Sequence, residues 1–168
     1  MNVFDVARTV LAVRRFQDKP VPDDLVHRIV ESARLTGSSS NRQPWSFIVV
    51  QDRNTLKQLG ALAAGGPYIA DAAFAVAVVM ERIPSAGSDA GRAIQTMALT
   101  AWAEGVGSNW VGTRGNEAFK TLLAVPANLD IAAIVPFGYP AMRIGKGKKN
   151  RKPLAQVAHR ERFGQAYE

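Results

Sequence analysis

Several short stretches of the chain carry side chains suited to holding an anionic, planar, heteroaromatic ligand. Two neighbouring arginines, Arg14 and Arg15, supply positive charge. Residues 38–41, Ser-Ser-Ser-Asn, supply hydrogen-bond donors on short side chains. Gly112 lies in a glycine-bracketed turn where a backbone can approach a ligand closely, and residues 143–152 form a basic segment. Together these pieces favour an anionic ligand such as a phosphate-bearing cofactor.

Other kinds of chemistry are excluded or disfavoured by the residues present. The chain has no cysteine, which excludes disulfides, thiolate metal ligands and cysteine nucleophiles. His27 lies on the polar side of its expected helix and His159 near the C-terminus, and we expect no metal site. No Gly-x-Ser-x-Gly sequence occurs, and the serines of residues 38–40 have no obvious base partner. Acyl transfer is therefore disfavoured.

Two glycine-rich segments resemble nucleotide-binding motifs only in composition. In residues 105–112 the third glycine falls at the wrong spacing for a dinucleotide-binding fingerprint, and the segment follows an expected helix rather than a strand. Residues 145–149 lack the Gly-Lys-Ser or Gly-Lys-Thr that ends a phosphate loop. Neither segment is interpreted as a nucleotide-binding motif.

The formal net charge of +7 is concentrated near the C-terminus, where residues 143–152 include six basic and no acidic side chains. Charge gathered in one short segment fits a localised anion site. A nucleic-acid-binding domain is the less favoured alternative, because the segment lacks interleaved aromatic residues. The apolar run of residues 72–80 is too short for a membrane span, and we recognise no signal peptide. We therefore expect a cytoplasmic protein with no membrane or nucleic-acid partner.

The elements that must position these residues alternate between helices and strands, which predicts one domain over residues 1–168 without repeats or linkers. Apolar periodicity, caps and turn residues set the expected boundaries. The predicted helices cover residues 3–12, 23–37, 55–62, 88–104 and 116–124. The predicted strands and extended segments cover residues 46–50, 73–80, 106–111 and 131–135.

The order of the motifs resembles that of the FMN-dependent nitroreductases. Residues 13–21, Val-Arg-Arg-Phe-Gln-Asp-Lys-Pro-Val, precede a helix and then residues 38–45, Ser-Ser-Ser-Asn-Arg-Gln-Pro-Trp. Asn-x-Gln-Pro-Trp at that offset is specific to the resemblance. Further matching segments, in the family's order, are Asp-Ala-Gly at 89–91 with Gln95, residues 105–108, residues 110–112, Gly-Tyr-Pro at 138–140 and residues 149–153. The resemblance covers nearly the whole chain.

The resemblance implies an α+β, nitroreductase-like fold, in which helices flank a mixed central β-sheet, and a homodimer with the flavin at its interface. It also implies FMN as cofactor and NAD(P)H as co-substrate. Hydride would pass to the flavin N5, and an acceptor such as a nitroaromatic or a quinone would then take electrons in the same slot. The implied activity is that of an NAD(P)H-dependent FMN oxidoreductase with a ping-pong mechanism.

Roles on the flavin's ring are carried over by position. Arg14 matches a cation near the pyrimidine edge, where positive charge stabilises the reduced ring, and Arg15 beside it is included as cofactor-binding. A solvated basic pair is the alternative for both arginines. The loop that reaches the flavin corresponds to Ser38, Ser39, Asn41 and Gln43. A turn that merely leads into a strand is the alternative for this loop.

Two further groups of residues are assigned in the same way. Val111, Gly112 and Thr113 match the turn whose backbone approaches the flavin N5 and O4, and Gly112 and Thr113 are the candidate catalytic positions. Glycine in a tight turn is the plain alternative. Lys149 and Arg151 match a Lys-x-Arg-x-Pro pattern that grips the flavin phosphate.

One departure from the family pattern lies just ahead of Arg14. Relatives carry an arginine and a serine there as phosphate and ribityl contacts, whereas this chain has Val10, Leu11 and Ala12. Arg8, one helical turn from Leu11, is a candidate replacement. Weaker FMN binding, a deazaflavin in place of FMN, or a non-catalytic flavin role are therefore open alternatives.

Overall fold

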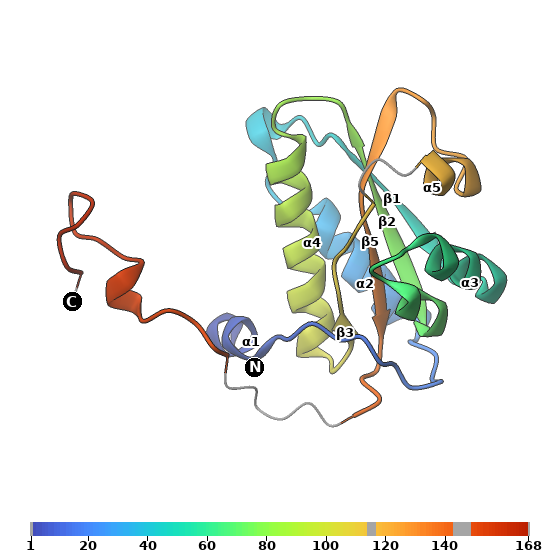
Figure 1. Ribbon diagram of the computed structural model, residues 1–168, viewed down its shortest axis with the longest axis horizontal. Coiled ribbons are helices and arrows are strands. Elements are labelled where there is room, and N and C mark those ends of the chain that lie inside the picture. The colour runs from blue at the N-terminus through green and yellow to red at the C-terminus, as the bar shows by residue number, and fades with distance from the viewer. Residues whose placement is uncertain (1, 114–116, 143–148, 168) are drawn as a thin grey trace.

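An antiparallel β-sheet forms the centre of the protein (Figure 1). The computed structural model describes residues 2–113, 117–142 and 149–167. Within these ranges the sheet has the strand order β1-β2-β5-β3, and β4 also pairs with β5. The strands are β1 (Trp45–Val50), β2 (Phe74–Glu81), β3 (Gly107–Ser108), β4 (Val111–Gly112) and β5 (Leu129–Gly138).

Helices cover both faces of the sheet (Figure 1). The α-helices are α1 (Val3–Thr9), α2 (Asp23–Arg34), α3 (Arg53–Leu62), α4 (Ala86–Ala103) and α5 (Glu117–Leu122). The described residues also form three short 3₁₀ turns, η1 (Ser39–Asn41), η2 (Pro67–Asp71) and η3 (Leu154–Gln156). None of the described helices is both long and apolar enough to span a membrane.

Strand β2 is buried along residues 74–80 because the sheet is covered on both sides. Its even-numbered residues, 74 to 80, pack in a core with residues of α2 and α4. Its odd-numbered residues, 75 to 79, pack in a second core with residues of α3 and α5. This alternation follows from the two-residue period of a strand. The continuous apolar run of residues 73–80 is therefore a central strand, as predicted.

The expectation of a mixed sheet is wrong for the described strands, since every pairing between them is antiparallel. The parallel contact observed is an isolated bridge between Ala12 and Ser108. The connection from β1 to β2 shows the reason. Val50, the last residue of β1, pairs with Ala75 near the start of β2, so α3 does not return the chain to the opposite end of the sheet, as a parallel crossover would require.

Several predicted boundaries also shift. Helix α1 ends at Thr9 rather than at residue 12. Helix α2 ends at Arg34 rather than near residue 37, and α4 begins at Ala86 rather than at Ser88. The predicted segment 106–111 is two short strands, and the predicted strand 131–135 extends over the whole of β5. Asn116, the first residue of the predicted helix 116–124, lies outside the described residues.

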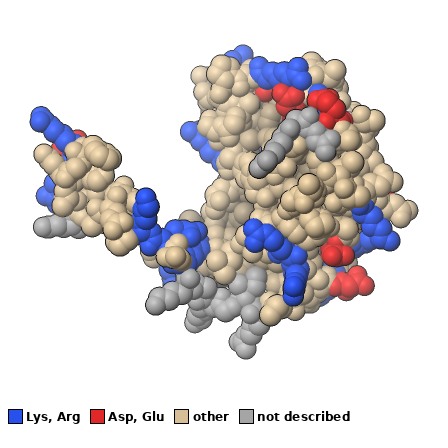
Figure 2. Space-filling model, viewed as in Figure 1, with Lys and Arg blue, Asp and Glu red and all other residues tan. Residues whose placement is uncertain are grey.

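The segment after Arg151 extends away from the body of the protein (Figures 1 and 2). Its backbone hydrogen bonds, such as Ala158 to Leu154, join residues of the segment to one another. Large apolar side chains are exposed along it, including Leu154, Val157 and Phe163, of which Phe163 is 93% exposed. Apolar surface of this kind on an extended arm indicates an interaction surface.

Candidate functional site

A pocket of about 340 Å³ lies between the end of α1, the middle of α4 and the segment that follows β3. Lys149 and Arg151 contribute its basic side chains, and none of its described lining residues is acidic. Trp110 forms part of its wall, together with the apolar residues of the chain just after α1. The pocket therefore combines positive charge at one side with an apolar surface.

Lys149 is held in this pocket by α1. Its ammonium group donates a 2.6 Å hydrogen bond to the Ala7 carbonyl oxygen, near the negative C-terminal end of the helix. Burial lowers the pKa of Lys149, and the neighbouring Arg151 charge lowers it further. No ion pair within the described ranges neutralises either cation. Two adjacent unneutralised cations, one of them an arginine with forked donors, fit a phosphate group.

The residues ahead of Arg14 that depart from the family pattern form part of this same pocket. Val10, Leu11 and Ala12 all line it, because the chain leaves α1 after Thr9 and runs beside β3. Arg8 does not replace the missing contact: its guanidinium pairs with Asp5 at 3.2 Å and is not among the lining residues. The proposal that Arg8 compensates is therefore wrong for this conformation.

A second hollow, of about 750 Å³, shares one lining residue, Trp110, with the first. Val111, Gly112 and Thr113 form one wall, with the chain after α3 and Phe119 opposite. A Cβ atom built on Gly112 meets nothing within 4 Å, and the backbone there is not in the left-handed region. Neither packing nor turn geometry requires glycine at this position. The open side of Gly112 is instead space that a ligand can occupy.

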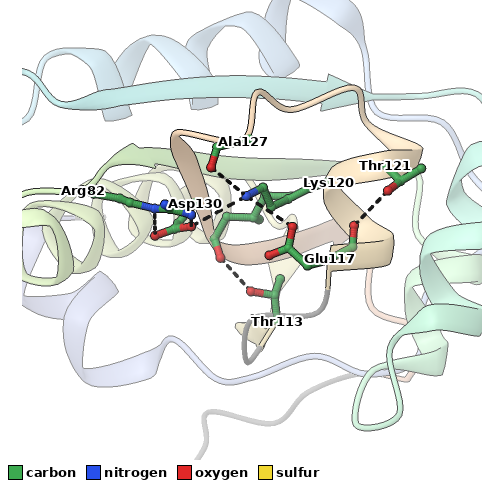
Figure 3. A network of polar contacts seen from close by, with 8 residues as sticks. Arg82, Thr113, Glu117, Lys120, Thr121, Ala127 and Asp130 are labelled. Atoms are coloured by element: carbon green, nitrogen blue, oxygen red, sulfur yellow. Dashed lines mark hydrogen bonds and ion pairs between the residues drawn. The ribbon is translucent and has the colours of Figure 1, made fainter.

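The Thr113 hydroxyl is already engaged. It donates a 2.6 Å hydrogen bond to the Ile131 carbonyl oxygen of β5. Figure 3 shows this contact beside a charged network in which Asp130 accepts two hydrogen bonds from Arg82 and lies 3.9 Å from Lys120. The Arg82 guanidinium holds the pKa of Asp130 below its usual value. The hydrogen bond to Ile131 ties Thr113 to β5 and uses the donor of its hydroxyl group.

Arg14 and Arg15 lie on an extended segment pinned at both ends. The Val13 amide donates to the Ser108 carbonyl at 2.9 Å, and the Gln17 amide donates to the Tyr139 carbonyl at 2.8 Å. Val13 also packs against Gly107, where an added Cβ would approach a Val13 methyl carbon to 2.3 Å. Both arginine side chains are exposed. The backbone is thus fixed while the charges remain available.

The predicted loop of residues 38–43 lies elsewhere. None of its residues lines either hollow. It packs at the N-terminal end of α4, whereas α1 lies near the other end of that helix (Figure 1). From Asp89 at the loop to Ala98 at the pocket, α4 rises about 14 Å. One copy of the chain therefore does not bring all the predicted site residues together.

Two residues at the site were not assigned a role from the sequence. Trp110 lines both hollows and is 48% exposed. Asp89 is fully buried and accepts a hydrogen bond from the Ser39 amide. Both stand in the motifs that carry the family resemblance, so motif position is the signal that marks them. Among the described residues, no group of three or more His, Cys, Asp or Glu side chains is placed to hold a metal ion.

Fold and site together define a class: a small α+β protein in which a two-cation pocket beside a long helix shares Trp110 with a glycine-lined hollow. Sequence comparison supplies the family. The sequence model of the Nitroreductase family matches residues 8–87 and 81–139, which together make up more than half of the chain. The chain belongs to the nitroreductase family of oxidoreductases.

Individual relatives agree with this assignment. A protein of Methanothermobacter thermautotrophicus, provisionally named NADH dehydrogenase/NAD(P)H nitroreductase, is 30% identical over 86% of this chain and 81% of its own length. The FMN reductase (NAD(P)H) of Bacillus subtilis is 28% identical over 90% of this chain and 70% of its own. An FMN-dependent nitroreductase from Clostridium difficile R20291 shares the fold with a TM-score of 0.86, at 23% identity, over 95% of this chain and 99% of that one.

Proposed function

We propose that the protein binds FMN as a homodimer and moves reducing equivalents from NAD(P)H to small acceptors such as nitroaromatics and quinones. The observation that carries the proposal is that Trp110 lines both hollows. Lys149 and Arg151 line one hollow and Gly112 lines the other. This arrangement suits a ligand with a phosphate at one end and a planar ring at the other. Relatives named FMN reductase and NAD(P)H nitroreductase support the cofactor and the co-substrate.

Each part of the site has a task in this proposal. Lys149 and Arg151 bind the phosphate by charge-assisted hydrogen bonds. The backbone of residues 111–113 orients the ring, and the open side of Gly112 lets the ring approach closely. Arg14 stabilises negative charge on the ring. When bound, FMN supplies a hydride acceptor at N5 and passes electrons onward. NAD(P)H and the acceptor use the slot in turn, which gives ping-pong kinetics.

The separation of the site residues supports the proposed homodimer. The loop of residues 38–43 carries four predicted flavin contacts, Ser38, Ser39, Asn41 and Gln43, yet lies away from the cation pocket of its own chain. An isologous second copy can supply the loop to each pocket, giving two equivalent sites. The exposed apolar arm around Phe163 provides further surface for such a partner.

The test is an acceptor assay. FMN-loaded protein is expected to oxidise NAD(P)H faster with menadione present than without it, because the acceptor reoxidises the bound flavin and frees it for another turnover. The same concentration of free FMN without protein serves as the control. If menadione adds nothing to the rate, the proposed activity is wrong.

The apolar wall at Val10, Leu11 and Ala12 carries a second candidate function. A chain with fewer polar phosphate contacts could bind a deazaflavin, or hold a flavin for a purpose other than turnover. The wall also makes a prediction about FMN itself. The double variant Val10→Arg with Ala12→Ser is expected to bind FMN about tenfold more tightly, because one added charge-assisted hydrogen bond contributes about 1.5 kcal/mol.

Titration of apoprotein with FMN measures this gain. Val49→Arg, which adds the same charge on the exposed side of β1, is the matched control and should leave the affinity unchanged. If the double variant gains nothing and the wild-type protein binds a deazaflavin more tightly than FMN, the second candidate replaces the first.

A further inference from the structure

Backbone strain is concentrated in the loop of residues 38–43. Ser40, Asn41 and Gln43 have φ angles of 51°, 53° and 52°, in the left-handed region that residues other than glycine seldom adopt. Over the described part of the chain, three of the five non-glycine residues with positive φ lie within these few positions. Such a conformation persists only where surrounding contacts hold it in place.

Few hydrogen bonds are available to hold the loop. Internally, the Gln43 amide donates to the Ser38 hydroxyl oxygen at 2.9 Å, and the Asn41 amide donates to the Ser38 carbonyl at 3.1 Å. Toward the rest of the protein, the Ser39 amide donates to Asp89 Oδ1 at 3.1 Å. Within the described ranges, this last bond is the one that joins the loop to an α-helix.

Asp89 is an unusual residue for the place it occupies. Its side chain is fully buried in the first turn of α4, where the positive end of the helix favours a carboxylate. Its second oxygen, Oδ2, has no hydrogen-bond partner among the described residues. The nearest cation, Arg92, lies 3.8 Å from Oδ1 with its side chain mostly exposed.

A buried carboxylate with one oxygen unpaired is not explained by its contribution to the stability of the fold. An apolar side chain of similar size would fill the space without leaving a buried oxygen unpaired. The contact that accounts for the carboxylate is therefore the one to the Ser39 amide. Asp89 anchors the start of the strained loop, and the internal bonds of the loop then set the conformation of residues 40–43.

We propose that Asp89 is a positioning residue that holds the loop of residues 38–43 in the strained conformation required to contact the flavin. The inference rests on the proposed FMN-binding function. Asp89 does not itself touch the cofactor in this account, since its carboxylate is enclosed. It acts through Ser39, by keeping the loop from relaxing into unstrained conformations that do not bind.

Two variants distinguish the effect of losing the hydrogen-bond acceptor at Asp89 from the effect of losing its side-chain volume. Asp89→Leu removes the acceptor and keeps a side chain of similar size, so the loop should relax. If about one loop in ten then remains competent, the dissociation constant for FMN rises about tenfold. Asp89→Asn keeps an acceptor oxygen for the Ser39 amide and should bind FMN nearly as the wild type does. This rescue is a result that a merely structural role in α4 would not produce.

Amide hydrogen exchange at Ser39 gives a readout that does not depend on flavin. Exchange should accelerate in Asp89→Leu and stay slow in Asp89→Asn. The matched control is Asp52→Ala, which removes another carboxylate-to-amide bond, from Thr55 to Asp52 at the start of α3. That variant should expose the Thr55 amide and leave both Ser39 exchange and FMN affinity unchanged.

The outcomes distinguish this inference from the proposed function. Wild-type FMN affinity in a folded Asp89→Leu protein, or equal loss in the Asn and Leu variants, would overturn the positioning role while the flavoprotein assignment stands. If the wild-type protein itself binds no FMN, the proposed function fails and the flavin role of Asp89 falls with it. Ser39 exchange then still decides whether Asp89 anchors the loop. Should Asp89→Leu fail to fold, Asp89→Ala takes its place in both measurements.

Discussion

Replacing both pocket cations, Lys149→Met with Arg151→Gln, is expected to weaken FMN binding about 100-fold. Each cation offers the phosphate a charge-assisted hydrogen bond worth about 1.5 kcal/mol at the low end of the usual range, and the two together give about 3 kcal/mol, or about 100-fold. The low end is appropriate because Arg151 is exposed to solvent. The fold should survive, since neither side chain belongs to a buried core. Fluorescence titration of apoprotein with FMN measures the loss.

The control must remove the same charge elsewhere. Lys57→Met with Arg34→Gln takes two positive charges from exposed positions that do not line the pocket. This control should change FMN affinity less than threefold or so, through long-range attraction alone. Equal weakening by the two double variants would mean that net charge, rather than the Lys149 and Arg151 pocket, binds the cofactor.

Gly112→Val is expected to lower kcat/KM for NAD(P)H oxidation about 100-fold while the protein remains folded. The backbone at Gly112 accommodates a Cβ, because nothing lies within 4 Å of that position. The added methyl groups would occupy the space in which the ring must approach the backbone, and a displacement of about 1 Å at a reacting centre costs on the order of 100-fold in rate. Gly112→Ala should show a smaller loss. Steady-state kinetics of the FMN-loaded variants measure both.

Gly87→Val is the matched substitution. Gly87 also has open space around its Cβ position, and it lines neither of the two hollows around Trp110. It should keep wild-type turnover, and a thermal melt of each variant separates misfolding from a site effect. Full activity in Gly112→Val would remove Gly112 from the site.

The sequence predicted well those elements whose burial is visible in the local pattern of apolar residues. Residues 73–80 are apolar without interruption, because both faces of β2 are covered. The end of α1 was predicted less well, since Val10 and Leu11 continue the apolar spacing of that helix. The chain leaves the helix because the Val13 amide pairs with the Ser108 carbonyl, a contact between distant segments that no local pattern contains.

The site shows the same division. Motif order predicted an anion site at Lys149 and Arg151. The structure brings these two residues into one pocket with residues 10–12, the apolar residues that depart from the family pattern. The separation of the loop from that pocket was not foreseeable, because it depends on the length and direction of α4. The role of Asp89 was not foreseeable either, because its burial and its hydrogen bond from the Ser39 amide exist only in the folded chain.

The most direct test of the central claim, that this chain holds FMN, is the visible absorption spectrum of the purified protein, repeated on the supernatant after denaturation. We predict flavin bands in the blue and near-ultraviolet that are released intact as FMN and that bleach in the native protein when NAD(P)H is added without oxygen. A colourless protein that also fails to bind FMN on titration would contradict the claim.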